Sequence, residues 1–100
     1  MIFIDGLLHR RTLWGQSDCA HMISDTSIEE LNSFAASIRL PQYWLQPFVF
    51  PRFEISPHWR RRALRAGAVD CAGPDRHHLY LEAMKRFYLA NPMWRPGRAS

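Results

Sequence analysis

The segment Thr26–Leu40 constrains the fold more than any other part of the chain, because it has the pattern of an amphipathic helix with both ends marked. Thr26-Ser27-Ile28-Glu29 matches a capping box, in which Thr26 accepts a hydrogen bond from the amide of Glu29. Apolar residues then recur at helical spacing, at Leu31, Phe34, Ala35 and Ile38. Because Pro41 disfavours helical geometry in the residue before it, the helix is predicted to end near Leu40.

Four short apolar runs predict strands. They are Ile2–Ile4, which ends at Asp5-Gly6, then Ala20–Ser24, Phe53–Ile55 and Ala68–Cys71. Residues 7–18 are mixed in character, and we predict a loop there. Residues 42–53 are aromatic and interrupted by prolines, which indicates irregular chain that leads into the third strand.

Two further helices are marked by their ends. Ser56 is a typical N-cap with Pro57 at the first helical position, and Gly67 is a typical C-cap, so a helix is predicted up to Ala66. A third helix is predicted to start at Gly73-Pro74-Asp75 and to stop at Asn91-Pro92.

The order of these elements predicts a small, single-domain α/β protein, with a mixed sheet of about four short strands and three helices. One hundred residues leave room for one core, which we place in residues 1–92, with residues 93–100 as a loose tail. Strand–helix–strand units make at least part of such a sheet parallel, with right-handed crossovers.

Composition excludes disordered and membrane-spanning proteins. Hydrophobic residues make up 47% of the chain and charged residues 22%, and no segment approaches the roughly 20 apolar residues of a membrane span. The start lacks the basic and long apolar regions of a signal peptide. We expect a cytoplasmic protein with no membrane partner. Cys19 and Cys71 are expected to be free thiols in a reducing compartment, while a disulfide between them stays open.

The charge is concentrated in the second half of the chain. Residues 1–50 carry a net charge of −2 and residues 51–100 a net charge of +6, and twelve of the thirteen basic residues are arginine. The planar guanidinium group suits phosphate and carboxylate groups, so this half favours an anionic partner. A GC-rich genome would give the same excess of arginine, and both interpretations stay open.

An ordered set of motifs runs through the first 70 residues. It comprises the opening strand that ends in Asp5, Cys19-Ala20-His21-Met22-Ile23-Ser24-Asp25-Thr26, Glu29-Glu30-Leu31, Phe34-Ala35, Trp44, Gln46, Phe53-Glu54-Ile55, Arg60, Ala63-Leu64 and Gly67-Ala68-Val69. Over about residues 2–70 this set resembles the domain of unknown function 4031 (DUF4031), a family of small proteins of which many are encoded by bacteriophages. The resemblance implies a phage or prophage setting and a functional centre between Cys19 and Val69.

The chain departs from the family pattern at two places. Arg52-Phe53-Glu54 stands where the family typically carries His-Tyr-Asp, and Trp59 stands where a lysine usually precedes the motif arginine, Arg60. The first change removes an imidazole and a phenol from the place where acid–base chemistry is expected. The comparison therefore implies that an ancestral activity is altered or absent, and that the helix after residue 70 is particular to this chain.

Four residues are candidates for an acid–base or divalent-metal site, if they converge at strand ends: Asp5, His21, Asp25 and Glu54. Each also has a structural interpretation. Asp5 fits a turn, His21 fits a satisfied residue of a strand, and Asp25 fits a helix cap. Glu54 and Arg60 either pair with each other or leave Arg60 to clamp an anion at a helix N-terminus. Neither the metal nor any other cofactor is identified by the sequence.

A basic helix face is predicted at Arg60, Arg61, Arg62 and Arg65. Further basic residues extend this candidate surface for nucleic-acid phosphates, namely Arg76, Lys85, Arg86, Arg95 and Arg98. Trp59 and Trp94 are candidates for stacking on bases, and with Trp44 they are candidates for an interface. An ordinary solvated face is an equally good interpretation, because no known nucleic-acid-binding motif accompanies the arginines. The adjacent His77-His78 diverge on a helix and do not make a metal pair.

Three functions compete. The leading hypothesis is a small phage-type binding protein, an inhibitor or accessory factor that occupies an anionic site on nucleic acid or on a host protein or nucleoprotein complex, as counter-defence proteins do. The rival is a metal-dependent phosphoester hydrolase or nuclease built on the four candidate residues and Arg60. The third is an assembly protein that forms a homo-oligomer through residues 42–53 or the third helix.

Overall fold

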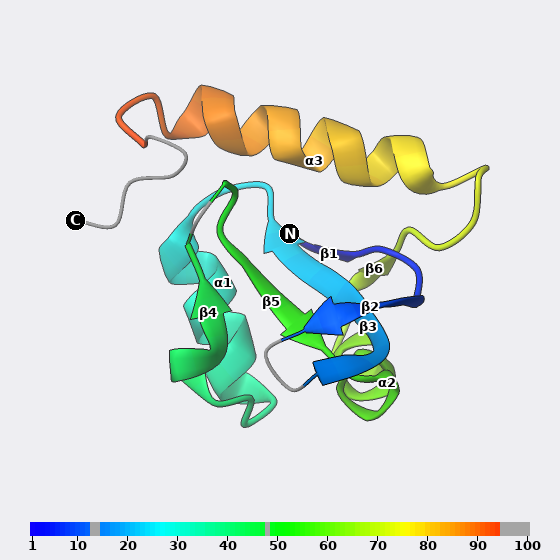
Figure 1. Cartoon of the computed structure of the whole chain (residues 1–100). Coiled ribbons are helices and arrows are strands. Elements are labelled where there is room, and N and C mark those ends of the chain that lie inside the picture. The colour runs from blue at the N-terminus through cyan, green and yellow to red at the C-terminus, as the bar shows by residue number, and fades with distance from the viewer. Residues whose placement is uncertain (13–14, 48, 95–100) are drawn as a thin grey trace.

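A single sheet forms the centre of the molecule, and helices cover both of its faces (Figure 1). The structure is a computed structural model that describes residues 1–12, 15–47 and 49–94. Its strands are β1 (Ile2–Ile4), β2 (Leu8–Thr12), β3 (Gly15–Ser24), β4 (Leu45–Gln46), β5 (Arg52–Ile55) and β6 (Val69–Asp70). Its helices are α1 (Ile28–Ser37), α2 (Pro57–Arg65) and α3 (His77–Ala90), with a short 3-10 helix η1 (Gln42–Trp44).

The long strand β3 organises the sheet. Its C-terminal half lies between β1 and β5, and its N-terminal half pairs with β2. The sheet runs in the order β4-β5-β3-β1-β6, with β2 attached to β3. All pairings are antiparallel except that of β1 with β6, which confirms the prediction of a partly parallel sheet.

The sheet separates two layers of core. Strand side chains alternate between faces, so Ile4, Met22 and Phe53 pack on the side of α1 and α2. Phe3 and Ile23 point the other way and pack under α3. Figure 1 shows α3 alone on its side of the sheet, with α1 and α2 on the opposite side. A residue's position along a strand therefore decides which helices it meets.

The predicted class, a small mixed α/β protein with three helices, is confirmed, but two strands were not predicted. The loop assigned to residues 7–18 is wrong, because β2 and β3 form a hairpin that pairs Leu8 with Cys19 and Thr12 with Gly15. The segment assigned to irregular chain contains β4, which pairs with β5. The sheet has six strands instead of about four.

The start of α1 lies one residue later than the capping box predicts. Ser27, and not Thr26, is the N-cap, and its hydroxyl accepts a hydrogen bond from the amide of Glu30 at 3.0 Å. The Thr26 hydroxyl donates instead to the carboxylate of Asp25. The Glu30 carboxylate accepts from the hydroxyl of Ser24 and does not return to the cap. The prediction of Thr26 as the cap is therefore wrong.

Replacing Ser27 with alanine is expected to lower the free energy of unfolding by about 1 kcal/mol, because one amide of the first turn loses its acceptor. Replacing Thr26 with alanine is the matched control and is expected to change stability by less than half as much, since it removes only an exposed contact. Urea titrations of both variants measure the difference. A larger loss at Thr26 than at Ser27 would restore the capping box of the sequence prediction.

The end of α1 passes through a residue in the left-handed region. Arg39 has φ of 66°, and the amide of Leu40 donates to the carbonyl of Ala35 at 2.8 Å. Glycine is the usual residue in this position, because a Cβ there costs about 1 kcal/mol. Arg39 is exposed. The chain therefore carries a charged side chain where backbone geometry favours glycine.

The two remaining helices agree with prediction except at one boundary. Ser56 caps α2, Pro57 is its first residue, and Gly67 with φ of 107° follows its end, as predicted. The prediction placed the start of α3 at residues 73–75, whereas a turn occupies those residues and α3 begins at His77.

Two expectations from composition can be compared with the structure. Among the described residues, no helix is both long enough and apolar enough to cross a membrane. Cys19 and Cys71 are both buried as free cysteines, in agreement with the expected thiols.

Candidate functional site

Three of the four candidates for an acid–base or metal site form a row across the sheet. Asp5 directly follows β1, His21 lies in β3, and Glu54 lies in β5 opposite His21. The amide of Asp5 donates to the carbonyl of His21 at 3.2 Å and so extends the pairing of β1 with β3. The three side chains share the α3 side of the sheet, and only 14% to 19% of each is exposed. We call them the polar row.

His21 is held by partners on both sides. Its backbone amide donates to Oδ1 of Asp5 at 2.6 Å, and its ring lies 3.5 Å from Oδ2 of Asp5 and 4.0 Å from Oε1 of Glu54. A terminal nitrogen of Arg10 lies 3.1 Å from Nδ1 and 3.2 Å from Nε2. Because this nitrogen is almost equally far from both ring nitrogens, it lies against the imidazole and not along the lone pair of one nitrogen. The guanidinium group therefore places a positive charge directly beside the ring.

Two arginines balance the carboxylates of the polar row. A terminal nitrogen of Arg52 lies 3.7 Å from Glu54 and donates to the side chain of Gln46 at 3.1 Å. Arg10 approaches from β2. Two of its side-chain nitrogens and Oε2 of Glu54 are buried with no hydrogen-bond partner among the described residues. Such groups are expensive to bury, so the row is a polar network with unused hydrogen-bonding capacity.

Tyr80 of α3 and the two cysteines near the polar row are held in their neutral forms. Burial raises the pKa of the Tyr80 hydroxyl, and the negative charge of Asp5 raises it further. Burial also raises the pKa of the thiols of Cys19 and Cys71. A buried thiol with a raised pKa is a poor nucleophile, so neither cysteine is suited to covalent catalysis.

Asp25 is not part of the polar row. It follows the end of β3 that lies beside the start of β1, whereas Asp5 follows the other end of β1. Its carboxylate accepts from the amino group of Met1 at 2.8 Å and from Nε of Arg86 at 3.0 Å. Although burial acts in the opposite direction, these contacts lower the pKa of Asp25. Asp25 is a structural residue that ties the start of the chain to α3.

No group of three His, Cys, Asp or Glu side chains in the described part of the chain has the arrangement of a metal site. The proposed set of Asp5, His21, Asp25 and Glu54 therefore does not assemble in this conformation. The polar row alone has two carboxylates and an imidazole, but Arg52 already pairs with Glu54 and Arg10 already contacts His21.

The departure from the family pattern at Arg52-Phe53-Glu54 falls on both faces of the sheet. Arg52 and Glu54 lie on the face of the polar row and pair with each other. Phe53 points to the opposite face, where it is completely buried against the helices α1 and α2. Position 53 of this chain therefore belongs to the core, whereas positions 52 and 54 belong to the polar face.

Arg60 pairs with Asp70 and not with Glu54. A terminal nitrogen of Arg60 donates to Oδ1 of Asp70 at 2.6 Å, and its Nε donates to the carbonyl of Asp5 at 3.1 Å. Only 13% of the Arg60 side chain is exposed. The expected pairing with Glu54 is wrong, because these side chains lie on opposite faces of the sheet. Arg60 fastens α2 to the ends of β1 and β6.

Asp70 predicts a pH dependence of stability. The amide of Ala72 lowers the pKa of this carboxyl group below its ordinary value of 3.8, and the hydrogen bond from Arg60 lowers it further, while burial acts against both. A carboxyl group with a lowered pKa stabilises the fold above its ordinary value, and the contribution is lost as the pH falls through the folded-state value.

We therefore expect the wild-type chain to be more stable than an Asp70→Asn variant near neutral pH, and this difference to shrink as the pH falls below about 4. Because 47% of the Asp70 side chain is exposed, the difference is expected to stay under about 1 kcal/mol. Thermal melts of both proteins between pH 2 and pH 7, a range of about 5 units around this titration, measure it. A difference that is constant over that range would contradict the assignment.

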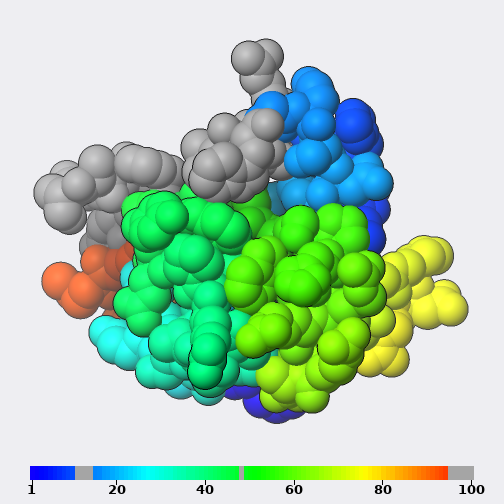
Figure 2. All heavy atoms as spheres, turned by 90° about the horizontal axis from the view of Figure 1, so that it is seen from below, coloured from blue at the N-terminus to red at the C-terminus, as the bar shows by residue number. Residues whose placement is uncertain are grey.

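A second candidate region lies on the opposite side of the molecule, around α2. Arg61, Arg62 and Arg65 of α2 are exposed, and Nε of Arg62 donates to the carbonyl of Ile38 at 2.7 Å. That bond brings α2 beside the end of α1, where Arg39 is exposed. Figure 2 shows α2 and the segment after α1 side by side on this face. We call Arg39, Arg61, Arg62 and Arg65 the basic face.

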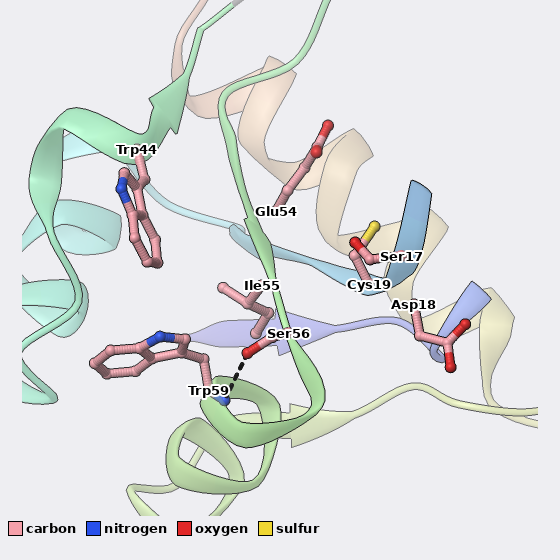
Figure 3. Close-up of a pocket in the computed structure, with 8 residues that line it drawn as sticks. All are labelled: Ser17, Asp18, Cys19, Trp44, Glu54, Ile55, Ser56 and Trp59. Atoms are coloured by element: carbon pink, nitrogen blue, oxygen red, sulfur yellow. Dashed lines mark hydrogen bonds between the residues drawn. The ribbon is translucent and has the colours of Figure 1, made fainter. Parts of the chain in front are cut away.

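A cavity of about 280 Å³ lies next to the basic face. Its lining comes from β3, η1, β5 and the start of α2, namely Ser17, Asp18, Cys19, Trp44, Glu54, Ile55, Ser56 and Trp59 (Figure 3). The rings of Trp44 and Trp59 meet edge to face with centroids 6.3 Å apart. The guanidinium group of Arg62 lies over the Trp59 ring, 5.6 Å from its centroid. Two of the three tryptophans predicted for an interface are thus neighbours.

The other predicted binding residues do not join this region. Trp94 packs on the α3 side, against Phe50 and Phe87. Arg86 pairs with Asp25, and Nε of Arg76 donates to the carbonyl of Asp70 at 2.5 Å. Lys85 is an exposed residue of α3, while Arg95 and Arg98 lie outside the described residues. The single basic surface expected from residues 60–98 is divided by the sheet.

Comparison with known proteins gives a family for most of the chain. The sequence model of the family described as "Protein of unknown function (DUF4031)" matches residues 2–83. The chain belongs to this family. The DUF4031 match extends past residue 70 into α3 and includes Tyr80, so the expectation that this helix is wholly particular to the chain is not supported over its first half. No curated protein and no solved structure matches the chain.

Sequence reasoning missed Arg10 and Asp18. Both belong to the β2–β3 hairpin, which was assigned to a loop. A loop assignment predicts neither the side of the sheet on which a side chain lies nor its neighbours on the next strand. The alternation of residues in a strand would have placed Arg10 near His21 had the hairpin been recognised. Arg39 was missed for another reason, since it approaches α2 only through the folded contact of Arg62 with Ile38.

Proposed function

We propose that this protein is a small binding protein that engages an anionic partner through the basic face. The observation that carries the proposal is the separation of charge. Residues 31–69 contain six arginines and a single acidic residue, Glu54. The basic face itself contains no acidic side chain from this stretch, and Glu54 is set apart from it among the residues that line the neighbouring cavity. An uncompensated surface of this kind attracts phosphate or carboxylate groups.

Stability accounts for only part of the basic face. Arg62 donates to the carbonyl of Ile38, and Arg65 lies in the last turn of α2, where the helix dipole favours a positive charge. Arg61 has neither role, and its like charge one helical turn before Arg65 destabilises the helix by a few tenths of a kcal/mol. Its side chain is exposed and forms no ion pair within the described part of the chain, so a partner explains it better than stability does.

Replacing both Arg61 and Arg65 with glutamate is expected to weaken binding to a polyanion by at least about 100-fold at low salt, because two attractive charges become repulsive. The measurement is fluorescence anisotropy with labelled oligonucleotides, polyglutamate and heparin over a series of salt concentrations. Binding of the wild-type chain is expected to weaken steeply as salt rises.

Lys85→Glu is the control, since Lys85 is exposed on α3, on the opposite side of the sheet. This change is expected to have a much smaller effect. Absence of salt-dependent binding to every polyanion, or equal losses in the two variants, would refute the proposal.

An inhibitory role is the natural use of such a surface in a chain this small. A protein that covers phosphate or carboxylate groups of a host protein or nucleoprotein complex blocks that site without any catalytic group. We propose this role, inhibitor or accessory factor, as the leading one. The positive charge of Arg10 beside the His21 ring, which opposes proton uptake by a general base, and the pairing of Arg52 with Glu54 support binding over catalysis.

A second candidate, phosphoester hydrolysis, is favoured by one observation, the convergence of Asp5, His21 and Glu54 in the polar row. In that function His21 would accept a proton from water once the guanidinium group of Arg10 turns to the substrate phosphate. The test is release of nitrophenol from a bis-nitrophenyl phosphate with and without Mg²⁺ or Mn²⁺. Hydrolysis that disappears in His21→Ala, but not in Glu82→Ala, would support this candidate, and a rate equal to the blank would eliminate it.

A further inference from the structure

We infer that the anionic partner is a single-stranded nucleic acid, and that the cavity that Trp44 and Trp59 help to line receives one of its unpaired bases. This inference rests on the proposed function and adds the class of partner. It depends on the position of an aromatic cavity directly beside the arginines that would hold phosphates.

The size and walls of the cavity fit a base. Its volume of about 280 Å³ is just below the range of about 300–1,000 Å³ that is typical of sites for larger ligands. Trp44, Trp59 and Ile55 supply apolar surface, and the two indole rings stand almost perpendicular, at 89°. A flat heterocycle can lie against one indole with its edge toward the other, and base–indole stacking is independent of the identity of the base.

The rim of the cavity is polar where the walls are apolar. Ser56 places a hydroxyl group among the lining residues. Ser56 Oγ accepts from the amide of Trp59 at 3.5 Å, a long contact that leaves its hydroxyl proton available to an acceptor. A nucleobase has hydrogen-bonding edges that can use such groups, whereas the phenyl ring of a protein side chain has none.

The arginines define the direction in which a strand would run. Arg62 lies over the Trp59 ring and uses Nε for the carbonyl of Ile38, so its two terminal nitrogens remain for a phosphate. Arg61 and Arg65 continue from there along the exposed surface of α2. Asp18 lines the cavity from β3 and is 60% exposed, so its negative charge favours a backbone that leaves toward α2.

The same geometry selects against a duplex. Bases of a duplex are paired and stacked, so none can enter a cavity lined by indole rings without being extruded. An acidic protein segment would use the basic face and leave the cavity unfilled. A single strand is the partner that uses both features at once.

The test compares single-stranded DNA and RNA of 12 nucleotides, a duplex of the same sequence and polyglutamate as probes for binding by anisotropy, at a length of about one site size. We expect the single strands to bind at least about tenfold more tightly than the duplex and polyglutamate, and to quench tryptophan fluorescence on binding.

Two substitutions at Asp18 separate the cavity from the charge. Asp18→Phe places a ring on the strand face that carries Ile55 and removes a negative charge, and it is expected to abolish the preference for the single strand. Asp18→Asn removes the same charge without filling the cavity, and it is expected to strengthen binding of the single strand. Because the two changes act in opposite directions, charge alone cannot explain them. Circular dichroism and a thermal melt establish that both variants are folded.

The possible failures are distinguishable. Equal affinity for single strand and duplex, with no difference between Asp18→Phe and Asp18→Asn, would overturn this inference and leave anion binding intact. Tighter binding of polyglutamate than of the oligonucleotides would overturn it in favour of an acidic protein. Absence of binding to every polyanion would remove the proposed function, and this inference with it.

Discussion

A Phe53→Ala variant is expected to lose about 3–5 kcal/mol of its free energy of unfolding. Phe53 is the second of the four residues of β5 and is fully buried, in the same cluster as Met22 and Leu31. Truncation removes the transfer free energy of the ring and leaves a cavity that the sheet cannot collapse to fill, since β5 is paired on both sides. A domain of this size has a total stability of about 5–15 kcal/mol, so the loss is a large part of it.

Denaturant titration of the purified variant measures this effect, and Leu89→Ala is the control because 73% of Leu89 is exposed. The control is expected to change stability by no more than about 0.5 kcal/mol. A Phe53→Ala protein within about 1 kcal/mol of the wild type would mean that position 53 is not the packed centre of the α1–α2 layer.

The second large effect is expected at Asp5, whose replacement by alanine should lower the free energy of unfolding by about 2–4 kcal/mol. Its carboxylate accepts from the backbone amide of His21 at 2.6 Å and lies 3.5 Å from the His21 ring, which Arg10 contacts in turn. Removing it leaves a buried donor without an acceptor and takes a negative charge away from the ring that Arg10 contacts, and both effects destabilise the fold.

Asp5→Asn separates these two contributions, because the amide oxygen still accepts from His21 while the charge is gone. We expect this variant to lose roughly half as much as Asp5→Ala. Glu82→Ala, an exposed position of α3, controls for the loss of a carboxylate and is expected to be within about 0.5 kcal/mol of the wild type. If Asp5→Ala matched Glu82→Ala, the polar row would be a surface feature instead of part of the folded framework.

The elements that sequence predicted well are those whose ends are marked by local chemistry. Ser56, Pro57 and Gly67 fix α2 through capping and backbone preference, and neither depends on distant parts of the chain. The start of α1 was misplaced by one residue because Thr26 and Ser27 are both good caps. Only the contacts of Glu30 with Ser24 and of Thr26 with Asp25 select Ser27.

The β2–β3 hairpin was missed because its residues are held by pairing and not by burial. Outside Cys19, its described residues on β3 before Ala20 are exposed or half-buried, so the apolar alternation that signals a strand is absent. Strand pairing with β1 and β5 extends only over the second half of β3, which is the part that was predicted. The first half follows from its attachment to β2, which no local pattern reveals.

The candidate site also contains residues that the sequence could identify and residues that depend on distant contacts. Asp5, His21 and Glu54 could be selected as polar residues at strand ends, and the register places them together. Asp25 could not be separated from them by sequence. It lies outside the polar row because the antiparallel pairing of β1 with β3 places it at the start of β1, whereas Asp5 follows the end of β1. The use of Arg60 as a fastener between α2 and Asp70 likewise depends on β6, which is distant in sequence from the start of α2.

The left-handed conformation of Arg39 sets two selective pressures against each other at one residue. Glycine would relax the backbone after α1 and would raise stability by about 1 kcal/mol, but it would also remove one of the four charges of the basic face. Optimisation for thermal stability alone would therefore tend to erase this arginine, and a lineage that keeps it accepts a weaker helix end in exchange for charge. Under the proposed function, folding and partner recognition therefore make opposite demands at Arg39.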